Sequence, residues 1–348
     1  MGSSNRKIKV FILGTDNINW SIDKDREATV YFLKENNFEI TNNFLKANVI
    51  FCVWYDLLLN PRYFWIKWIK RFLNKKIIAV ITNDVTFYPQ KIEILREYVN
   101  VFIAPSEKIY KYLKENGIKV YKIPFFVDHR IFKPFLISKE QVCKKLNIDW
   151  GLIKDKFLIG SFQRDSLGSD LTKPKWQKNP DLLIKILNKL PKDRFVLILT
   201  GPRRHYIINQ CEKVGIPYLF YGDKKYITEL KDDLIVNNMD TEKIALLYNL
   251  IDLYIIPSKS EGGPKAILES SLTKTLIVST AVGLAPDILH PDLIYEEEDY
   301  KKIVNFTKDI MEKKINVEKY IDYNYQRVTD VLDEKKLLEK YAILIKNI

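Results

Sequence analysis

The chain has 348 residues and a net charge of +12 at neutral pH, with 47% hydrophobic and 13% aromatic residues. This is enough apolar material for two cores, and no stretch has the composition of a disordered segment. Three widely separated cysteines argue against a disulfide framework. The apolar run 8–13 is too short for a signal sequence, and no later stretch approaches the length of about 18 apolar residues of a membrane span, so we expect a cytoplasmic protein.

The first part of the chain alternates between short apolar runs and helical stretches. We expect strands at 8–13, 49–53, 77–81 and 101–104, with helices near 25–36, 61–74, 91–98 and 106–116. This alternation predicts a doubly wound parallel sheet, that is, a Rossmann-like domain over residues 1–135. The stretch 331–348 has the pattern of an amphipathic helix.

A second series of the same kind follows, and the join lies between Phe132 and Lys156, where Pro134 interrupts the chain. Residues 136–330 therefore form a second Rossmann-like domain. Its expected strands are 157–160, 195–200, 218–220, 234–236, 253–256 and 276–279.

The segment 61–76 is a basic amphipathic helix. Wound at 100° per residue, it places Trp65, Ile66, Trp68, Ile69, Phe72 and Leu73 on one face, opposite Lys67, Lys70, Arg71 and Lys75. A crossover helix packed on the sheet has this pattern, and so does a helix at the surface of an anionic membrane. Both interpretations hold if the aromatic residues divide between core and membrane.

The most informative motif surrounds a glycine turn. An apolar strand ends before Pro257, and a helix is expected to start at Pro264, whose missing N–H is harmless at the first helical position. Gly262, Gly263 and the free amides of Lys265 and Ala266 would thus face a ligand at the carboxyl end of the strand, where such sheets bind diphosphates. Glu261 and Glu269 can contact opposite ends of that ligand.

This motif resembles the donor-binding signature of retaining GT-B glycosyltransferases of family 4, also called glycosyl transferases group 1. The resemblance covers most of the chain. It includes 159–164 followed by Lys178 and Asn179, the strand 196–201 ending at Gly201, Val278–Gly283, Ala104–Ser106 and Ile123–Asp128. It implies two Rossmann-like domains with a cleft between them, an N-terminal domain that binds the acceptor, and a last helix that crosses back onto that domain.

The resemblance also implies roles for single residues. Arg164 and Lys178 would hold the donor diphosphate without a metal, and Lys173 and Lys175 are near enough in sequence to compete for the role of Lys178. Glu261 would bind the donor sugar and Glu269 the ribose, while the anomeric configuration is retained. Asn238 lies in a segment where contacts to the base are expected.

In the first domain the acceptor site is expected near Gly14 and Thr15. Asp84 stands in the region where many members of the family have a histidine. We expect no cofactor and no metal, because His129, His205 and His290 lie far apart in sequence and Asp23-Lys24-Asp25 begins a helix.

The expected partners are a UDP- or GDP-linked sugar, a glycan or lipid-linked acceptor and, through residues 61–76, an anionic membrane. No nucleic-acid-binding motif is present. Two alternatives to a glycosyltransferase remain open at this point: a nucleotide-sugar epimerase of the same architecture, and a catalytically silent relative that binds glycans.

Overall fold

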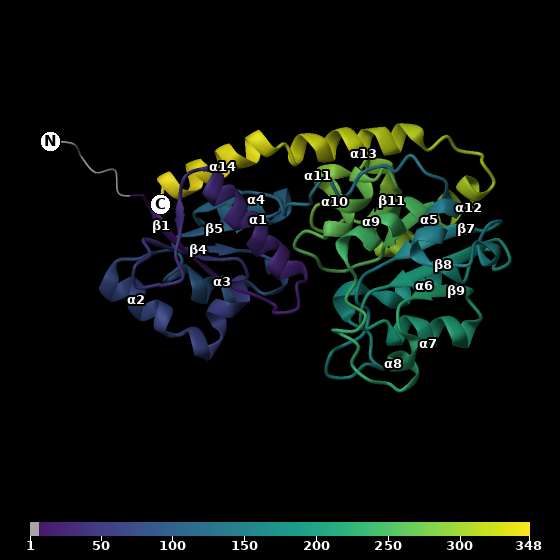
Figure 1. Cartoon of the computed structure of the whole chain (residues 1–348), viewed down its shortest axis with the longest axis horizontal. Coiled ribbons are helices and arrows are strands. Elements are labelled where there is room, and N and C mark those ends of the chain that lie inside the picture. Colours follow the sequence, from purple (N-terminus) through teal and green to yellow (C-terminus); the bar gives the residue numbers. More distant parts are fainter. Residues whose placement is uncertain (1–6) are drawn as a thin grey trace. The chain divides into compact units, whose positions relative to one another are not determined.

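The computed structural model describes residues 7–348, which form two compact units (Figure 1). Among the described residues, unit 1 contains those up to Phe126 together with Val331–Ile348, and unit 2 contains Val127–Asp330. The division between the units lies a few residues before the expected boundary at 135 and 136. Each unit has one six-stranded sheet flanked by helices, and every strand pairing is parallel.

The sheet of unit 1 has the strand order β2-β1-β3-β4-β5-β6. Its strands are β1 Lys9–Leu13, β2 Glu39–Ile40, β3 Val49–Cys52, β4 Lys76–Val80, β5 Val101–Ala104 and β6 Val120–Lys122. The four strands expected from the sequence are confirmed. The edge strands β2 and β6 were not expected, because each is short and neither has a buried residue to reveal it as an apolar run.

The helices of unit 1 agree with the expected ones within a few residues at each end. They are α1 Ser21–Glu35, α2 Trp65–Leu73, α3 Pro89–Arg96, α4 Glu107–Glu115 and α14 Glu334–Lys346, with short 3₁₀ turns η1 Tyr55–Leu59, η2 Pro61–Tyr63 and η3 Val85–Phe87. Asp23 lies in the first turn of α1 and accepts a hydrogen bond from the backbone N–H of Asn19, as expected of first-turn charge.

The C-terminal helix α14 packs against α1 in unit 1 (Figure 1). The Tyr341 ring stacks on Phe32, with 5.1 Å between ring centroids and 12° between ring planes, and its centroid lies 6.2 Å from that of Phe51. The side-chain amide of Asn36 donates a hydrogen bond of 2.9 Å to the carbonyl of Leu338. Both ends of the chain therefore contribute to the same core.

The sheet of unit 2 has the order β12-β11-β10-β7-β8-β9. Its strands are β7 Phe157–Ser161, β8 Phe195–Thr200, β9 Tyr218–Tyr221, β10 Leu253–Ile256, β11 Leu276–Thr280 and β12 Ile294–Tyr295. From β7 the chain continues through β8 to β9 at one edge of the sheet. It then returns to β10 on the other side of β7 and continues through β11 to β12 at the opposite edge. The strand order thus reverses between β7 and β10, and the carboxyl ends of these two strands are where open sheets bind ligands.

One expected strand of unit 2 is wrong. Residues 234–236 lie in a loop, and Ile235 is 75% exposed. The side chains of Asp233 and Asn237 on either side are fully buried and bond to each other, so the polar residues anchor this segment and its apolar residues face solvent.

The helices of unit 2 connect its strands. They are α5 Lys139–Leu146, α6 Pro180–Leu187, α7 His205–Val214, α8 Lys224–Thr228, α9 Thr241–Leu250, α10 Lys265–Leu272, α11 Ala285–Ile288, α12 Tyr300–Met311 and α13 Glu318–Val331, with 3₁₀ turns η4 Trp150–Leu152, η5 Trp176–Lys178, η6 Pro291–Leu293 and η7 Glu297–Asp299. The three cysteines are buried free thiols. Within residues 7–348, none of the helices has the length and apolar composition needed to cross a membrane.

Replacing Tyr341 with Ala should destabilise the protein by about 3–5 kcal/mol, because the change leaves a cavity between Phe32 and Phe51. Ile343→Ala on the same helix should cost less than about 1 kcal/mol, since Ile343 is 41% exposed. Urea unfolding followed by circular dichroism measures both. Equal losses for the two variants would contradict the packing described for α14.

Candidate functional site

Glu261 lies in the loop that follows β10, where its carboxylate is bound by two other side chains. The Ser258 hydroxyl donates a hydrogen bond of 2.8 Å to Oε1, and the ammonium of Lys178, from η5, forms an ion pair with the same oxygen. The side chains of Lys178 and Glu261 are only 19% and 12% exposed. The structure therefore brings together two of the expected catalytic residues from distant parts of the sequence.

The glycine turn requires a close approach of two loops. Pro264 is the N-cap of α10 and the helix begins at Lys265, one residue later than expected. Gly283, after β11, has a left-handed backbone (φ +50°), and a Cβ there would lie 2.7 Å from Cδ of Pro264 and 3.0 Å from Cα of Gly263. No side chain fits at Gly283, so this glycine fixes the position of the Gly262-Gly263-Pro264 turn.

Glu269 lies further along α10 and is half-buried. The hydroxyl of Tyr248, from α9, donates a hydrogen bond of 3.0 Å to its Oε2 atom. Burial raises the pKa of Glu269, while the bond from Tyr248 and the charge of Lys265 oppose the rise. Both oxygens of Glu269 can accept hydrogen bonds when the side chain is ionised, and Tyr248 occupies one of them.

A cluster of basic side chains faces Glu261. Arg164 follows β7, and Lys175 and Lys178 lie at and within η5. Burial, together with the charges of Arg164 and Lys178, lowers the pKa of Lys175 to about 7, and Glu261 opposes the shift. These residues lie at the carboxyl ends of β7 and β10, where the strand order reverses.

Lys173 differs from its neighbours in this cluster. Its side chain is 68% exposed and its nearest carboxylate, Asp170, lies 3.4 Å away. Lys175 is half-buried, and the charges of Arg164, Lys178 and Glu261 act on it, so it lies nearer than Lys173 to the expected diphosphate site. Which lysine holds the diphosphate stays a prediction.

Asn179 has a backbone conformation that favours glycine or asparagine. It precedes α6 with a left-handed backbone (φ +46°), which glycine adopts freely and asparagine better than most other residues. Its side-chain amide nitrogen is buried and, within residues 7–348, has no hydrogen-bond partner.

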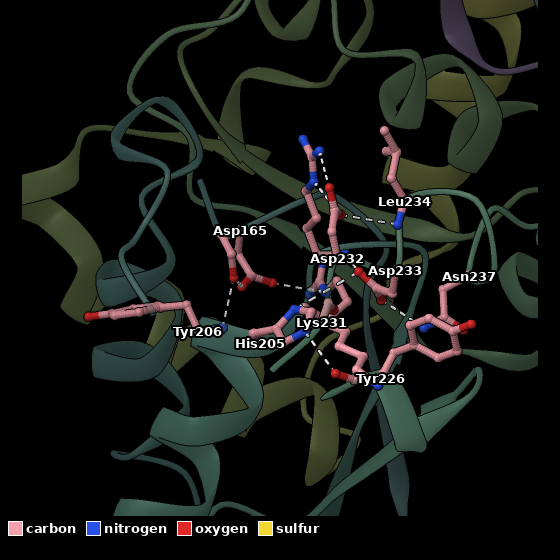
Figure 2. A network of polar contacts seen from close by, with 12 residues as sticks. Asp165, His205, Tyr206, Tyr226, Lys231, Asp232, Asp233, Leu234 and Asn237 are labelled. Carbon is pink, nitrogen blue, oxygen red and sulfur yellow. Dashed lines mark hydrogen bonds and ion pairs between the residues drawn. The ribbon is translucent and has the colours of Figure 1, made fainter. Parts of the chain in front are cut away.

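A buried polar network supports the loops on the β8 side of this site (Figure 2). Arg204 and Asp165 form an ion pair, with Nε and Oδ2 separated by 2.9 Å, and their side chains are 1% and 3% exposed. Arg204 also donates a 3.0 Å hydrogen bond to the hydroxyl of Ser161, and Asp165 accepts one of 3.0 Å from the backbone N–H of Ile207. Burial raises the pKa of Asp165 to about 6, against the opposing charge of Arg204.

The same network anchors the loop that contains Asn238. Asp233 accepts a 2.7 Å hydrogen bond from the backbone N–H of Arg203, and a second of 2.7 Å from the amide of Asn237 (Figure 2). Asn238 itself is half-buried, next to Asn237. Gly201, directly after β8, has a left-handed backbone (φ +84°). A residue with a side chain would be strained in this conformation.

The candidate residues Thr15 and Asp84 of unit 1 bond to other side chains of the same unit. Gly14 has φ +114°, and the Thr15 hydroxyl donates a hydrogen bond of 2.5 Å to Asp23. Asp84 is fully buried, pairs with Lys108 at 2.7 Å and accepts hydrogen bonds from the backbone and hydroxyl of Thr86. Asp84 thus caps a turn in this structure, and its role as an acceptor contact stays a prediction.

Sequence reasoning missed three side chains of the site. Ser258 follows the strand end at Pro257 and was given no role, and neither was Gln163, whose side-chain oxygen accepts a 3.3 Å hydrogen bond from Ser258. Tyr248 gives no signal, because a tyrosine in an apolar helix is usually a core residue. Among residues 7–348 there is no group of three His, Cys, Asp or Glu side chains arranged to hold a metal ion.

Comparisons with known proteins agree with this architecture. Residues 173–327 match the family described as glycosyl transferases group 1. HepE from Anabaena, solved in complex with UDP and glucose, aligns with a TM-score of 0.71 at 12% identity, covering 98% of this chain and 100% of that chain. Sucrose-phosphate synthase from Thermosynechococcus elongatus aligns with a TM-score of 0.74 at 11% identity, covering 98% and 99%.

A glycosyltransferase from Rickettsia africae aligns with a TM-score of 0.57 at 15% identity, covering 98% of this chain and 97% of that chain. No curated protein matches the chain. The shared architecture of two parallel-sheet units is the GT-B fold. The chain is a glycosyltransferase of this fold, and the Lys178–Glu261 pair lies within the residues 173–327 that match glycosyl transferases group 1.

Arg204→Met should destabilise the protein by about 3–5 kcal/mol at pH 8, because it leaves the carboxylate of Asp165 buried without its counter-charge. The loss should be smaller at pH 5, since Asp165, whose pKa is already about 6, is then protonated in the variant. Urea unfolding at the two pH values tests this. The exposed Arg194, replaced by Met as a control, should change stability by less than about 1 kcal/mol at either pH. A loss that does not depend on pH would contradict this account.

Proposed function

We propose that the protein is a retaining, metal-independent hexosyltransferase, which moves a sugar from a UDP- or GDP-linked donor to a glycan or lipid-linked acceptor at the cytoplasmic face of a membrane. The observation that supports this best is the set of Arg164, Lys175, Lys178 and Glu261 at the carboxyl ends of β7 and β10. A diphosphate is the ligand that such an excess of positive charge favours.

The departure of the nucleoside diphosphate places negative charge on its terminal phosphate. Arg164 and Lys178 are positioned to compensate that charge, a role that a divalent ion has in other enzymes. Lys178 is paired with Glu261 in the free protein. When the ammonium of Lys178 binds the diphosphate in place of Glu261, the Glu261 carboxylate becomes available to accept hydrogen bonds from the sugar hydroxyls.

Glu269 is suited to hold the ribose. One of its oxygens is occupied by Tyr248, which fixes the carboxylate, and the other remains for the ribose hydroxyls. The acceptor oxygen then bonds to the anomeric carbon on the face from which the diphosphate leaves, and its proton passes to the departing phosphate oxygen. The configuration at the anomeric carbon is retained. UDP in the HepE structures supports UDP as the first nucleotide to test.

Arg164→Ala and Glu269→Ala should each raise the dissociation constant for the donor nucleotide at least tenfold, which is about 1.4 kcal/mol. The measurement is a thermal-shift titration of each protein with UDP, GDP and ADP, with and without EDTA, followed by turnover with the sugar conjugate of the nucleotide that binds. We expect the shift to persist in EDTA.

The exposed Lys189, replaced by Ala, is the matched control in unit 2 and should behave as wild type. Normal binding and turnover in both site variants would refute the donor site. A shift that EDTA abolishes would refute metal independence. Release of free nucleotide at the same rate without any acceptor would favour an epimerase or hydrolase.

The membrane part of the proposal depends on α2, whose aromatic residues divide between core and surface. Ile66 and Ile69 are buried, and Trp65 is half-buried with its ring 4.6 Å from that of Phe44. The outer α2 patch consists of the exposed side chains Phe64, Trp68, Phe72 and Leu73. Trp68 and Phe72 are 61% and 67% exposed, and their rings stack on each other.

Basic residues lie beside this patch. Arg62 and Arg71 are exposed, whereas Lys70 is bound to the carbonyl of Glu97 and Lys75 to that of Leu45. Exposed tryptophan and phenylalanine next to arginine suit the interface of an anionic bilayer, where the rings enter the headgroup region. A lipid-linked acceptor would be reached at such a surface.

Replacing Trp68 and Phe72 together with Ser should weaken binding to vesicles that contain anionic lipid at least tenfold, because both exposed rings are removed from the surface that would enter the headgroup region. Vesicle co-sedimentation with and without phosphatidylserine measures this. Ile94→Ser on α3 is the control, since Ile94 is also exposed but lies outside the patch. Unchanged binding of the double variant, with its melting temperature preserved, would refute the membrane contact.

A further inference from the structure

Lys175 is held in place by the backbone around it. Its own N–H donates a hydrogen bond of 2.6 Å to the carbonyl of Asp165, and its carbonyl accepts one of 2.9 Å from Lys178. The chain between Asp165 and Lys175 forms a closed loop, in which Ser166 and Pro174 pair as an antiparallel bridge. Lys175 is therefore fixed beside the end of β7, next to Arg164.

The 165–175 loop also contacts Arg203, through both the backbone and the side chain of that residue. The N–H groups of Asp165 and Ser166 donate to the carbonyl of Arg203, and a Cβ added to Gly168 would lie 2.4 Å from the guanidinium of Arg203. That guanidinium is itself bound by the carboxylate of Asp232, with hydrogen bonds of 2.9 and 2.7 Å. Arg203 thus adds another fixed positive charge near Lys175.

Of the four charges with the largest effect on Lys175, three are positive, although one of them, Arg203, is itself paired with Asp232. Arg164, Lys178 and Arg203 act on it as cations, and the nearby carboxylate, Glu261, is already paired with Lys178 and bonded to Ser258. Among residues 7–348, none provides a salt-bridge partner for the ammonium of Lys175. Burial and these like charges together hold its pKa at about 7.

We propose that Lys175 is a third diphosphate-binding side chain of the donor site, and that its amine takes up a proton from solvent when the diphosphate binds. The proposal rests on the function proposed above. A diphosphate brings the negative charge that this cluster lacks, and a nearby anion favours the charged form of an amine. The proton moves from solvent to Nζ, and no other bond is made or broken.

The coupling has a definite pH dependence. Below pH 7 the amine of the free protein is already charged, so binding takes up little or no proton. Above pH 7 it must be protonated on binding, and the donor affinity falls by up to tenfold for each pH unit until the pKa of the complex is reached. The terminal phosphate of a nucleoside diphosphate, with a pKa of about 6, is fully ionised in this range and does not contribute.

The test is isothermal titration calorimetry of the whole protein with UDP, and separately with inorganic pyrophosphate, at pH 8.5. Two buffers of different ionisation enthalpy give the number of protons taken up. With UDP we expect an uptake close to one proton for wild type. Pyrophosphate, which itself still holds a proton at this pH, tests only whether the diphosphate group binds. Lys175→Met should bind at least tenfold more weakly, with no uptake. Lys175→Arg should keep most of the affinity without uptake, because a guanidinium is always charged.

The same variants show whether the lysine has a structural role instead. Lys175→Met should melt at the same temperature as wild type or higher at pH 8.5, because it removes a half-buried amine that has no partner. Lys189→Met, at an exposed position, should leave binding and proton uptake unchanged. A lower melting temperature together with unchanged affinity would assign Lys175 to stability and overturn the proposal.

Failure of this inference differs from failure of the proposed function. If UDP binds and its binding depends on Arg164, yet wild type takes up no proton or Lys175→Met takes up as many, only the role of Lys175 is refuted. If UDP, GDP, ADP and pyrophosphate all fail to bind, the donor site and the role of Lys175 fall together.

Discussion

The constraint on which unit 2 depends is an excess of positive charge at the carboxyl ends of β7 and β10. Arg164, Lys175 and Lys178 repel one another there, and Glu261 compensates for only part of their charge. Like charges at a half-buried site destabilise the folded state, so other interactions must keep them together. The backbone bonds of the 165–175 loop and the buried Asp165–Arg204 pair provide that support.

The pairing of Lys178 with Glu261 has two consequences for the site. In the free protein it compensates a buried charge on each partner, which limits the cost of assembling the site without ligand. It also holds both side chains in a defined place, so that little side-chain entropy remains to be lost on binding. Gly283 and Asn179 also help to place these side chains. Gly283 allows its loop to approach the Gly262-Gly263-Pro264 turn, and the left-handed backbone of Asn179 turns the chain from η5 into α6.

The sequence is most informative where one physical requirement determines the residue type. Buried strands need continuous apolar runs, and the glycine turn needs residues without bulk, so the main strands and the Glu261–Glu269 motif were predictable. Residues 234–236 were misread because their anchors, Asp233 and Asn237, act through tertiary bonds that no local pattern reveals. For the same reason the sequence does not reveal the bond from Tyr248 to Glu269 or the charges that surround Lys175. Both depend on segments that are distant in sequence.

The packing of α14 against α1 makes unit 1 discontinuous in sequence, with unit 2 inserted before its final helix. During synthesis every residue of unit 2 is made before α14. Domains generally fold as units while the chain grows. The residues of unit 2 are thus available first, and the aromatic surface of Phe32 and Phe51 that receives Tyr341 stays uncovered until α14 is made. Unit 1 begins before unit 2 and is finished after it.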